Sequence, residues 1–158
     1  MQLSGQCYFD VKKGKPFSVD FGEGSLEVLG TSFDVKVRDD IFLVKCFTRK
    51  ISVKNIMNQS CVLTRGQQVK SINGELNKTT FISTSPNWMK GCYVYENELL
   101  SSVLNDMVAE YNLVISGKSY DKRFTGKLQK DNLEKAVKVL FGSLGIEYSL
   151  THKELKIE

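Results

Sequence analysis

The sequence has few residues suited to metal binding. Its 158 residues include one histidine and four cysteines, at positions 7, 46, 61 and 92, with no CxxC pair. A structural zinc site needs four nitrogen or sulfur ligands that include closely spaced pairs. We therefore expect no metal. Cys7 and Cys46 lie in strand-like segments, where cysteine behaves as a small apolar residue, so buried free thiols are expected, with one disulfide left open for an oxidising compartment.

Catalytic patterns are also absent. His152 lies in a polar turn near the C-terminus, which is a poor position for the preorganised base of a Ser–His–Asp site. The Gly22-Glu23-Gly24 turn lacks the lysine and the following helix of a phosphate-binding loop. Asp39-Asp40 fits a turn better than a buried acid–base pair. We predict that the chain is not an enzyme, with no catalytic residues and no cofactor.

No long hydrophobic run is present. The densest apolar run, residues 41–47, is far shorter than the roughly 20 residues that span a bilayer, so it is interpreted as a buried strand. Residues 1–11 are typical of a strand with a turn behind it rather than of a secretory signal. We expect either a cytosolic protein or a soluble piece of a longer one.

A dense basic stripe with interleaved aromatics is lacking as well. The net charge is only +4, and the one local concentration of positive charge lies between Lys118 and Lys130. Nucleic-acid readers usually carry a denser pattern, so we interpret this concentration as a solvated loop face and predict no nucleic-acid partner.

What is present in the first half is a series of short alternating runs separated by turn signals. At intervals of about 8–12 residues, such runs indicate an all-β sandwich or barrel-like pair of sheets. The expected strands are 7–11, 17–21, 26–29, 33–38, 41–47, 51–53, 61–63, 69–72 and 81–83. The small, polar segment around Pro86 predicts a boundary between an all-β domain, 1–86, and a second domain, 87–158.

The second half repeats itself. Residues 100–115 match residues 133–148 in apolar pattern at an offset of 33, each copy having a helix, a hinge residue (Asn112 or Gly145) and a strand. Helices are expected over 98–110, capped by Asn97, and over 132–142, opened by Asp131 in a capping-box-like pattern. Gly142 and Gly145 are the expected exits of the second helix. With strands at 92–95, 113–116, 123–128, 146–151 and 154–157, the order is βαβ–βαββ.

A right-handed crossover in each repeat predicts that both helices cover one face of a single small sheet. The chain is thus expected to be mainly β plus α+β. Residues 154–158 alternate charged and apolar side chains and are expected to form a terminal edge strand. Such an edge is either protected by its charges or accepts a strand from a partner. Two tandem units without evident chemistry favour binding over catalysis.

Several motifs in this order resemble the periplasmic part of FecR-type anti-sigma factors. The strongest is Val28-Leu29-Gly30-Thr31-Ser32-Phe33-Asp34-Val35, which matches the family's Val-Leu-Gly-Thr-x-Phe-x-Val. Further matches are residues 5–11, 16–19 and 63–67 in the first half, and 88–91, 99–104, 111, 124–126 and 133–137 in the second. The closing segment is similar to the short N-terminal signalling domain of secretins and TonB-dependent transducers.

This resemblance implies a periplasmic sensor region that relays a signal by protein–protein binding. The implied partners are the signalling domain of a TonB-dependent outer-membrane transporter and a site protease. An ECF sigma factor and the inner membrane would be reached only through a cytosolic segment and a transmembrane helix that this chain lacks. The candidate partner-binding residues are Trp88, Tyr148, Leu155 and Ile157, although Trp88 also suits a packing role.

Functions of other classes stay open. The first domain could bind carbohydrate, for which an exposed aromatic stripe involving Tyr8, Tyr93 and Tyr95 would be the sign. The second domain could be an assembly module of a cell-envelope protein, as in the rings of a secretion channel. An enzyme would need His152 buried beside a carboxylate.

Overall fold

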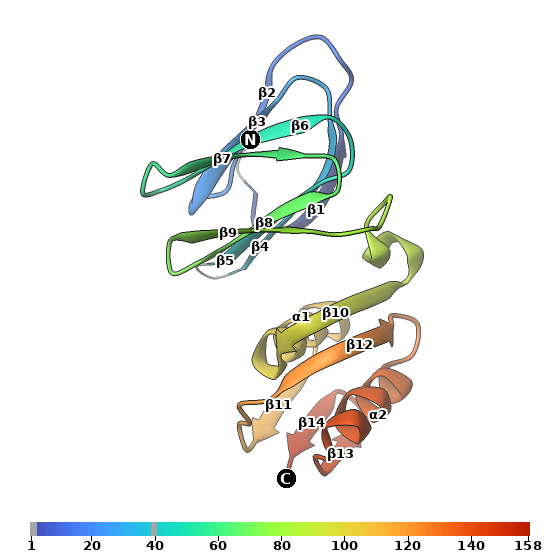
Figure 1. Ribbon diagram of the computed structural model, residues 1–158. Helices are drawn as coiled ribbons and strands as arrows, with labels where there is room; N and C mark the ends of the chain where they lie inside the picture. The colour runs from blue at the N-terminus through green and yellow to red at the C-terminus, as the bar shows by residue number, and fades with distance from the viewer. Residues whose placement is uncertain (1–2, 39–40) are drawn as a thin grey trace. The chain divides into compact units, whose positions relative to one another are not determined.

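The computed structural model of the chain describes residues 3–38 and 41–158, so the turn expected at Asp39-Asp40 lies outside the described residues. The chain divides into two compact units, Met1–Pro86 and Asn87–Glu158, here called the first and second units (Figure 1). Strands predominate, and the two α-helices of the described residues both belong to the second unit. The expected class, mainly β plus α+β, is confirmed.

The first unit contains two antiparallel sheets. One has the order β1 (Gly5–Asp10), β4 (Ser32–Arg38), β5 (Ile41–Cys46), β8 (Gln67–Ile72) and β9 (Glu75–Thr80); the other has the order β2 (Phe17–Asp20), β3 (Gly24–Val28), β6 (Lys50–Asn55) and β7 (Ser60–Thr64). Alternate residues of both sheets face one shared core, in which Phe33, Phe42, Ile51 and Leu63 are fully buried. Period-2 alternation of apolar residues is what places these side chains on the inner faces.

Strand β9 is the element of this unit that sequence analysis missed. It covers Glu75–Thr80, whereas the expected strand at 81–83 does not form. Five of its six residues are exposed and only Leu76 is half-buried. An edge strand that is solvated on both faces carries no apolar alternation, so its sequence has no period-2 signal to detect.

The elements of the second unit follow the expected order βαβ–βαββ. They are the 3-10 turn η1 (Asn87–Lys90), β10 (Cys92–Leu99), α1 (Leu100–Tyr111), β11 (Val114–Gly117), β12 (Arg123–Gln129), α2 (Leu133–Leu144), β13 (Tyr148–Thr151) and β14 (Glu154–Ile157). The two helices begin and end 33 residues apart, as the internal repeat predicts. Both hinges are left-handed, with φ of 55° at Asn112 and 62° at Gly145.

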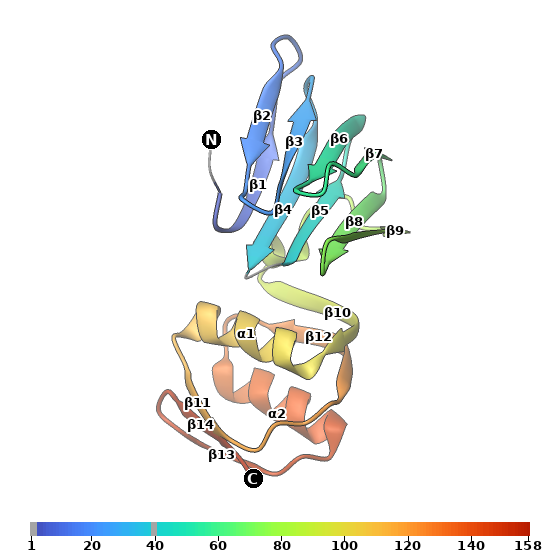
Figure 2. The ribbon, with the colours of Figure 1, turned by 90° about the vertical axis from the view of Figure 1, so that its left-hand side faces the viewer.

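The strand pairing of the second unit differs from the expectation of one sheet with both helices on one face. Strand β10 pairs with β12 in a two-stranded sheet, while β11, β14 and β13 form a second sheet in that order. The helices lie between these two sheets (Figure 2), and one core joins Phe124, Val137 and Leu155 from the three layers. The expectation is wrong because β10 and β11 enter different sheets, so the first repeat makes no crossover within a sheet.

Strand β14 is the middle strand of its sheet, so its expected place at the edge is also wrong. It pairs in parallel with β11 and antiparallel with β13. Its alternation arises because Leu155 and Ile157 face the core and the charged residues face solvent. A central strand with one solvated face gives the same period-2 pattern as a protected edge strand.

Both helix caps differ from the expected ones. The N-cap of α1 is Leu99 without a side-chain cap, and the first helical N–H, of Leu100, donates to the Lys122 carbonyl instead. Asn97 has a positive φ of 50° beside an irregularity in the β10–β12 register. The N-cap of α2 is Asn132, whose Oδ1 accepts from the Lys135 N–H at 2.8 Å. Among the described residues, no helix has the length and apolar character needed to cross a membrane.

Candidate partner-binding surfaces

The four residues predicted to contact a partner do not share one surface. Leu155 and Ile157 are 0% and 4% exposed, and their side chains belong to the core of the second unit. Tyr148 is half-buried, with its ring centroid 5.0 Å from that of Phe141. Trp88 is also half-buried, on the turn η1. Only Tyr148 and Trp88 therefore retain side-chain surface that a partner could cover.

Trp88 belongs to a cluster held together by Lys130. The Lys130 Nζ lies 5.9 Å from the centroid of the Trp88 ring and 5.2 Å from that of Tyr93. It also lies 3.0 Å from Glu110 Oε1, and the Tyr93 hydroxyl donates to Glu110 Oε2 at 2.7 Å. The cluster links η1, β10, α1 and the residue after β12, which favours the packing role for Trp88. In the sequence, Lys130 is one residue of a basic stretch, and no local pattern predicts its contacts with Trp88, Tyr93 and Glu110.

This cluster predicts a pH-dependent contribution to stability. Burial, followed by the Glu110 carboxylate, raises the pKa of Tyr93 above its ordinary value. The folded state thus favours the neutral phenol, and its stabilising effect is present below the unfolded pKa of about 10 and is lost as the pH rises above it. We expect Tyr93→Phe to cost about 1–2 kcal/mol of unfolding free energy at pH 7, because a hydrogen bond to a charged acceptor is lost.

Urea titrations of the full chain at pH 7 and at alkaline pH measure this effect. The cost of Tyr93→Phe should shrink toward alkaline pH, since the wild-type chain alone loses the contribution of the phenol. Glu110→Gln keeps an acceptor for the Tyr93 hydroxyl but removes the negative charge. It should therefore reduce the pH dependence of the unfolding free energy while leaving most of the hydrogen bond's contribution in place. An equal cost of Tyr93→Phe at both pH values would contradict the assigned contact.

The three-stranded sheet has two open edges, at β11 and at β13. No other strand of the described residues pairs there. The Glu158 N–H donates to the Glu147 carbonyl, so the backbone groups of Glu147 face β14. Successive residues of an antiparallel strand direct their backbone groups to opposite sides, so those of Tyr148 and Leu150 face away from β14. Both side chains are half-buried and form an apolar rim along β13. This edge, the β13 edge, has the unpaired backbone groups and apolar side chains on which an added strand depends.

The edge of β7 in the first unit is better protected. The Lys78 Nζ donates to the Val62 carbonyl at 2.7 Å. The Thr64 N–H donates to Gln67 Oε1 at 2.9 Å. Side chains thus occupy backbone groups that would otherwise receive another strand, which is a common way of blocking an edge. The β7 edge is therefore less suited than the β13 edge to accept another strand.

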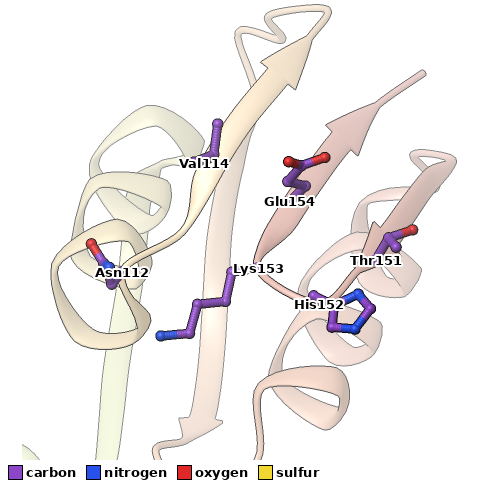
Figure 3. A pocket seen from close by; sticks show the side chains of 6 residues that line it. All are labelled: Asn112, Val114, Thr151, His152, Lys153 and Glu154. Atoms are coloured by element: carbon purple, nitrogen blue, oxygen red, sulfur yellow. The ribbon is translucent and has the colours of Figure 1, made fainter.

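A shallow hollow of about 520 Å³ lies beside the turn between β13 and β14 (Figure 3). Its lining residues are Asn112, Val114, Thr151, His152, Lys153 and Glu154. Figure 3 shows Lys153 extending toward Asn112 below the start of β11. His152 is exposed in the turn, so the burial beside a carboxylate that an enzyme would require is not found.

The cysteines and aromatics give no separate site. All four cysteines are free thiols, and burial raises the pKa of the Cys46 thiol to about 11, which keeps it protonated. Within the described residues, no group of three or more histidine, cysteine, aspartate or glutamate side chains could hold a metal ion. Tyr95 is buried, and Tyr8 packs edge-on against Phe47, so the tyrosines named for carbohydrate binding do not form an exposed stripe.

Comparisons with known proteins agree with the motifs. The model of the FecR protein family matches residues 1–52. A crystal structure at 1.65 Å of a protein described as a putative anti-sigma factor from Parabacteroides distasonis ATCC 8503 is 24% identical, with a TM-score of 0.89 over 99% of this chain and 78% of that one. A second structure so described, at 2.50 Å, is 26% identical with the same TM-score and coverage. No curated protein matches the chain.

These findings concern different parts of the chain. The family model covers about the first third, whereas the likeness in fold extends over both units. The motif Val28–Val35, which carries the strongest resemblance, lies within the matched residues and forms the end of β3, the tight connection at Gly30 and the start of β4. The findings together support the resemblance to a FecR-type anti-sigma factor region.

Proposed function

We propose that this chain is the periplasmic sensor region of a transmembrane anti-sigma factor regulator and receives its signal by binding the signalling domain of a TonB-dependent outer-membrane transporter. In this proposal the first unit is a FecR-like domain and the second is a domain of the short signalling type. Regulated proteolysis of the full-length regulator then releases an ECF sigma factor. The open β13 edge of the second unit is the observation that supports partner binding.

The β13 edge suits a signal that must be reversible. An added strand gains its affinity from backbone hydrogen bonds and its specificity from the side chains that flank them. Here the flanking side chains are Tyr148 and Leu150, and the opposite face of the strand carries Ser149 and Thr151. A strand of this length, Tyr148–Thr151, offers few backbone hydrogen bonds, so we expect moderate rather than very tight binding.

Calorimetric titration of the full chain with the signalling domain of the transporter encoded beside it tests this proposal. Saturable binding is expected, with at least a tenfold loss of affinity in Leu150→Pro, because proline removes an N–H that faces the open edge. The matched variant is Val114→Pro on the other side of the sheet. Its N–H donates to the Lys153 carbonyl, so this substitution weakens the β11–β14 pairing without touching the β13 edge.

The outcomes separate the alternatives. Binding by the wild-type chain that Leu150→Pro does not change, with folding verified by circular dichroism, would show that the partner uses another surface. No binding by the intact chain would contradict this transporter as the partner. Glycan screening and measurement of ring formation would then address the carbohydrate and assembly functions.

A further inference from the structure

One end of the first unit gathers four connections between its two sheets. The connections are β1–β2, β3–β4, β5–β6 and β7–β8. The strand registers place them together: Asp10 pairs with Ser32, and Cys46 pairs with both Phe33 and Gln67. In the other sheet, Phe17 pairs with Val28 and Lys50 with Thr64. The strands leading to this end can be followed in Figure 2.

These connections carry a concentration of cations, here called the basic end. Its members are Lys12, Lys13, Lys15, Arg49, Lys50 and Arg65. All six side chains are exposed, and none forms a hydrogen bond, ion pair or ring contact with another described residue. The connecting segments 11–16, 29–31, 47–49 and 65–66 contain no acidic residue. Asp10 and Glu27 are the acidic residues closest to them in the chain, and Asp10 accepts a hydrogen bond from the Ser32 hydroxyl.

An exposed leucine lies among these cations. Leu29 is 60% exposed although it immediately follows the buried Val28. The next residue, Gly30, packs so closely on the first connection that a Cβ would lie 2.5 Å from the Lys13 Cα. The Thr31 hydroxyl donates to the Lys50 carbonyl at 3.0 Å. These two contacts fix the backbone that carries the cations. Leu29 and the lysines are therefore held at the same end of the unit by the backbone and not by contacts between their side chains.

We propose that the basic end docks on an anionic bilayer surface. Diffuse attraction to lipid phosphates suits lysine, a point charge on a long flexible stem, and four of the six cations are lysines. The cations extend over four connections rather than along one strand, which matches a broad surface better than a single acidic peptide. Leu29 adds an apolar side chain that can enter the headgroup region, as in other peripheral contacts. This inference goes beyond the proposed function and does not depend on the transporter.

Co-sedimentation of the full chain with lipid vesicles tests the proposal. We expect binding to vesicles containing about one-third phosphatidylglycerol at about 0.05 M salt, strong weakening at about 0.5 M salt, and no binding to pure phosphatidylcholine. A basic residue near such a surface contributes about a fivefold change in binding, so the triple change Lys12→Ser, Lys13→Ser and Lys15→Ser should lower the partition coefficient about a hundredfold.

The matched control removes three exposed lysines of the second unit, by Lys118→Ser, Lys135→Ser and Lys138→Ser. It has the same net charge as the first triple variant and should retain most of the vesicle binding. Leu29→Ser should weaken vesicle binding several-fold but leave binding to a poly-glutamate peptide unchanged. Equal losses in both triple variants would show attraction by net charge alone and overturn the proposal. Binding to poly-glutamate without binding to vesicles would overturn it in favour of an acidic protein partner.

Discussion

Replacing Gly117 with alanine is expected to destabilise the second unit by about 3 kcal/mol or more. Gly117 ends β11 with φ of 101°, a conformation that side chains rarely adopt. A Cβ at this position would lie 1.9 Å from the Ile157 carbonyl oxygen. Because that oxygen also accepts from the Lys118 N–H, relief of the overlap would require β11 to separate from β14.

Gly142→Ala is the matched control. Gly142 lies inside α2, and a Cβ there would meet nothing within 4 Å. Alanine should stabilise the helix by about 0.5–1 kcal/mol, since glycine loses more backbone freedom on folding. Urea unfolding of the full chain followed by the fluorescence of Trp88, the single tryptophan, measures both changes in the second unit. Similar stabilities for Gly117→Ala and the wild type would contradict the parallel β11–β14 pairing.

The sequence predicted the local structure of the second unit better than its strand pairing. The repeat placed both helices and both left-handed hinges, because apolar periodicity and hinge residues act over only a few positions. Gly145 is the C-cap of α2, as expected, whereas Gly142 lies inside the helix. The pairing of β10 with β12 joins segments about 30 residues apart, and nothing in either strand encodes which partner it takes.

Long-range contacts also explain why the helix N-caps and the position of β14 in its sheet were predicted wrongly. Asn97 has the residue type of a cap, but its N–H donates to the Thr125 hydroxyl across the β10–β12 sheet. The tertiary contact between Leu100 and Lys122 then satisfies the helix end. Likewise, the pattern of Glu154–Ile157 identified a half-buried strand but could not distinguish an edge from the middle of a sheet. Local patterns determine which face is apolar, and long-range contacts determine what covers it.

For the candidate site, the sequence predicted four partner-binding residues. The structure buries Leu155 and Ile157 and leaves side-chain surface on Tyr148 and Trp88. Residue type alone marked Trp88, because tryptophan is over-represented among interface hot spots. The Lys130–Glu110 ion pair, in contrast, joins positions 20 residues apart and has no local sequence signature. The basic end also depends on topology, since its cations come from segments as distant as Lys12 and Arg65.

Leu155→Ala is expected to lower the unfolding free energy of the second unit by about 2–5 kcal/mol. Leu155 is fully buried in β14, the middle strand between β11 and β13, so truncation leaves a cavity under both helices. Val114→Ala in the neighbouring strand β11 is the control, because Val114 is 64% exposed and should change stability by at most about 0.5 kcal/mol. Urea unfolding monitored by Trp88 fluorescence compares the two variants.

This comparison also decides how a binding defect at Leu155 is interpreted. A partner could contact the Leu155 side chain only if β14 left the core. The central position of β14 in its sheet opposes such a movement. We therefore expect Leu155→Ala to reduce binding to the proposed transporter partner only in proportion to the fraction of unfolded chain. A variant that stayed as stable as the wild type yet lost binding would show that Leu155 contacts the partner directly, and would contradict its place in the core.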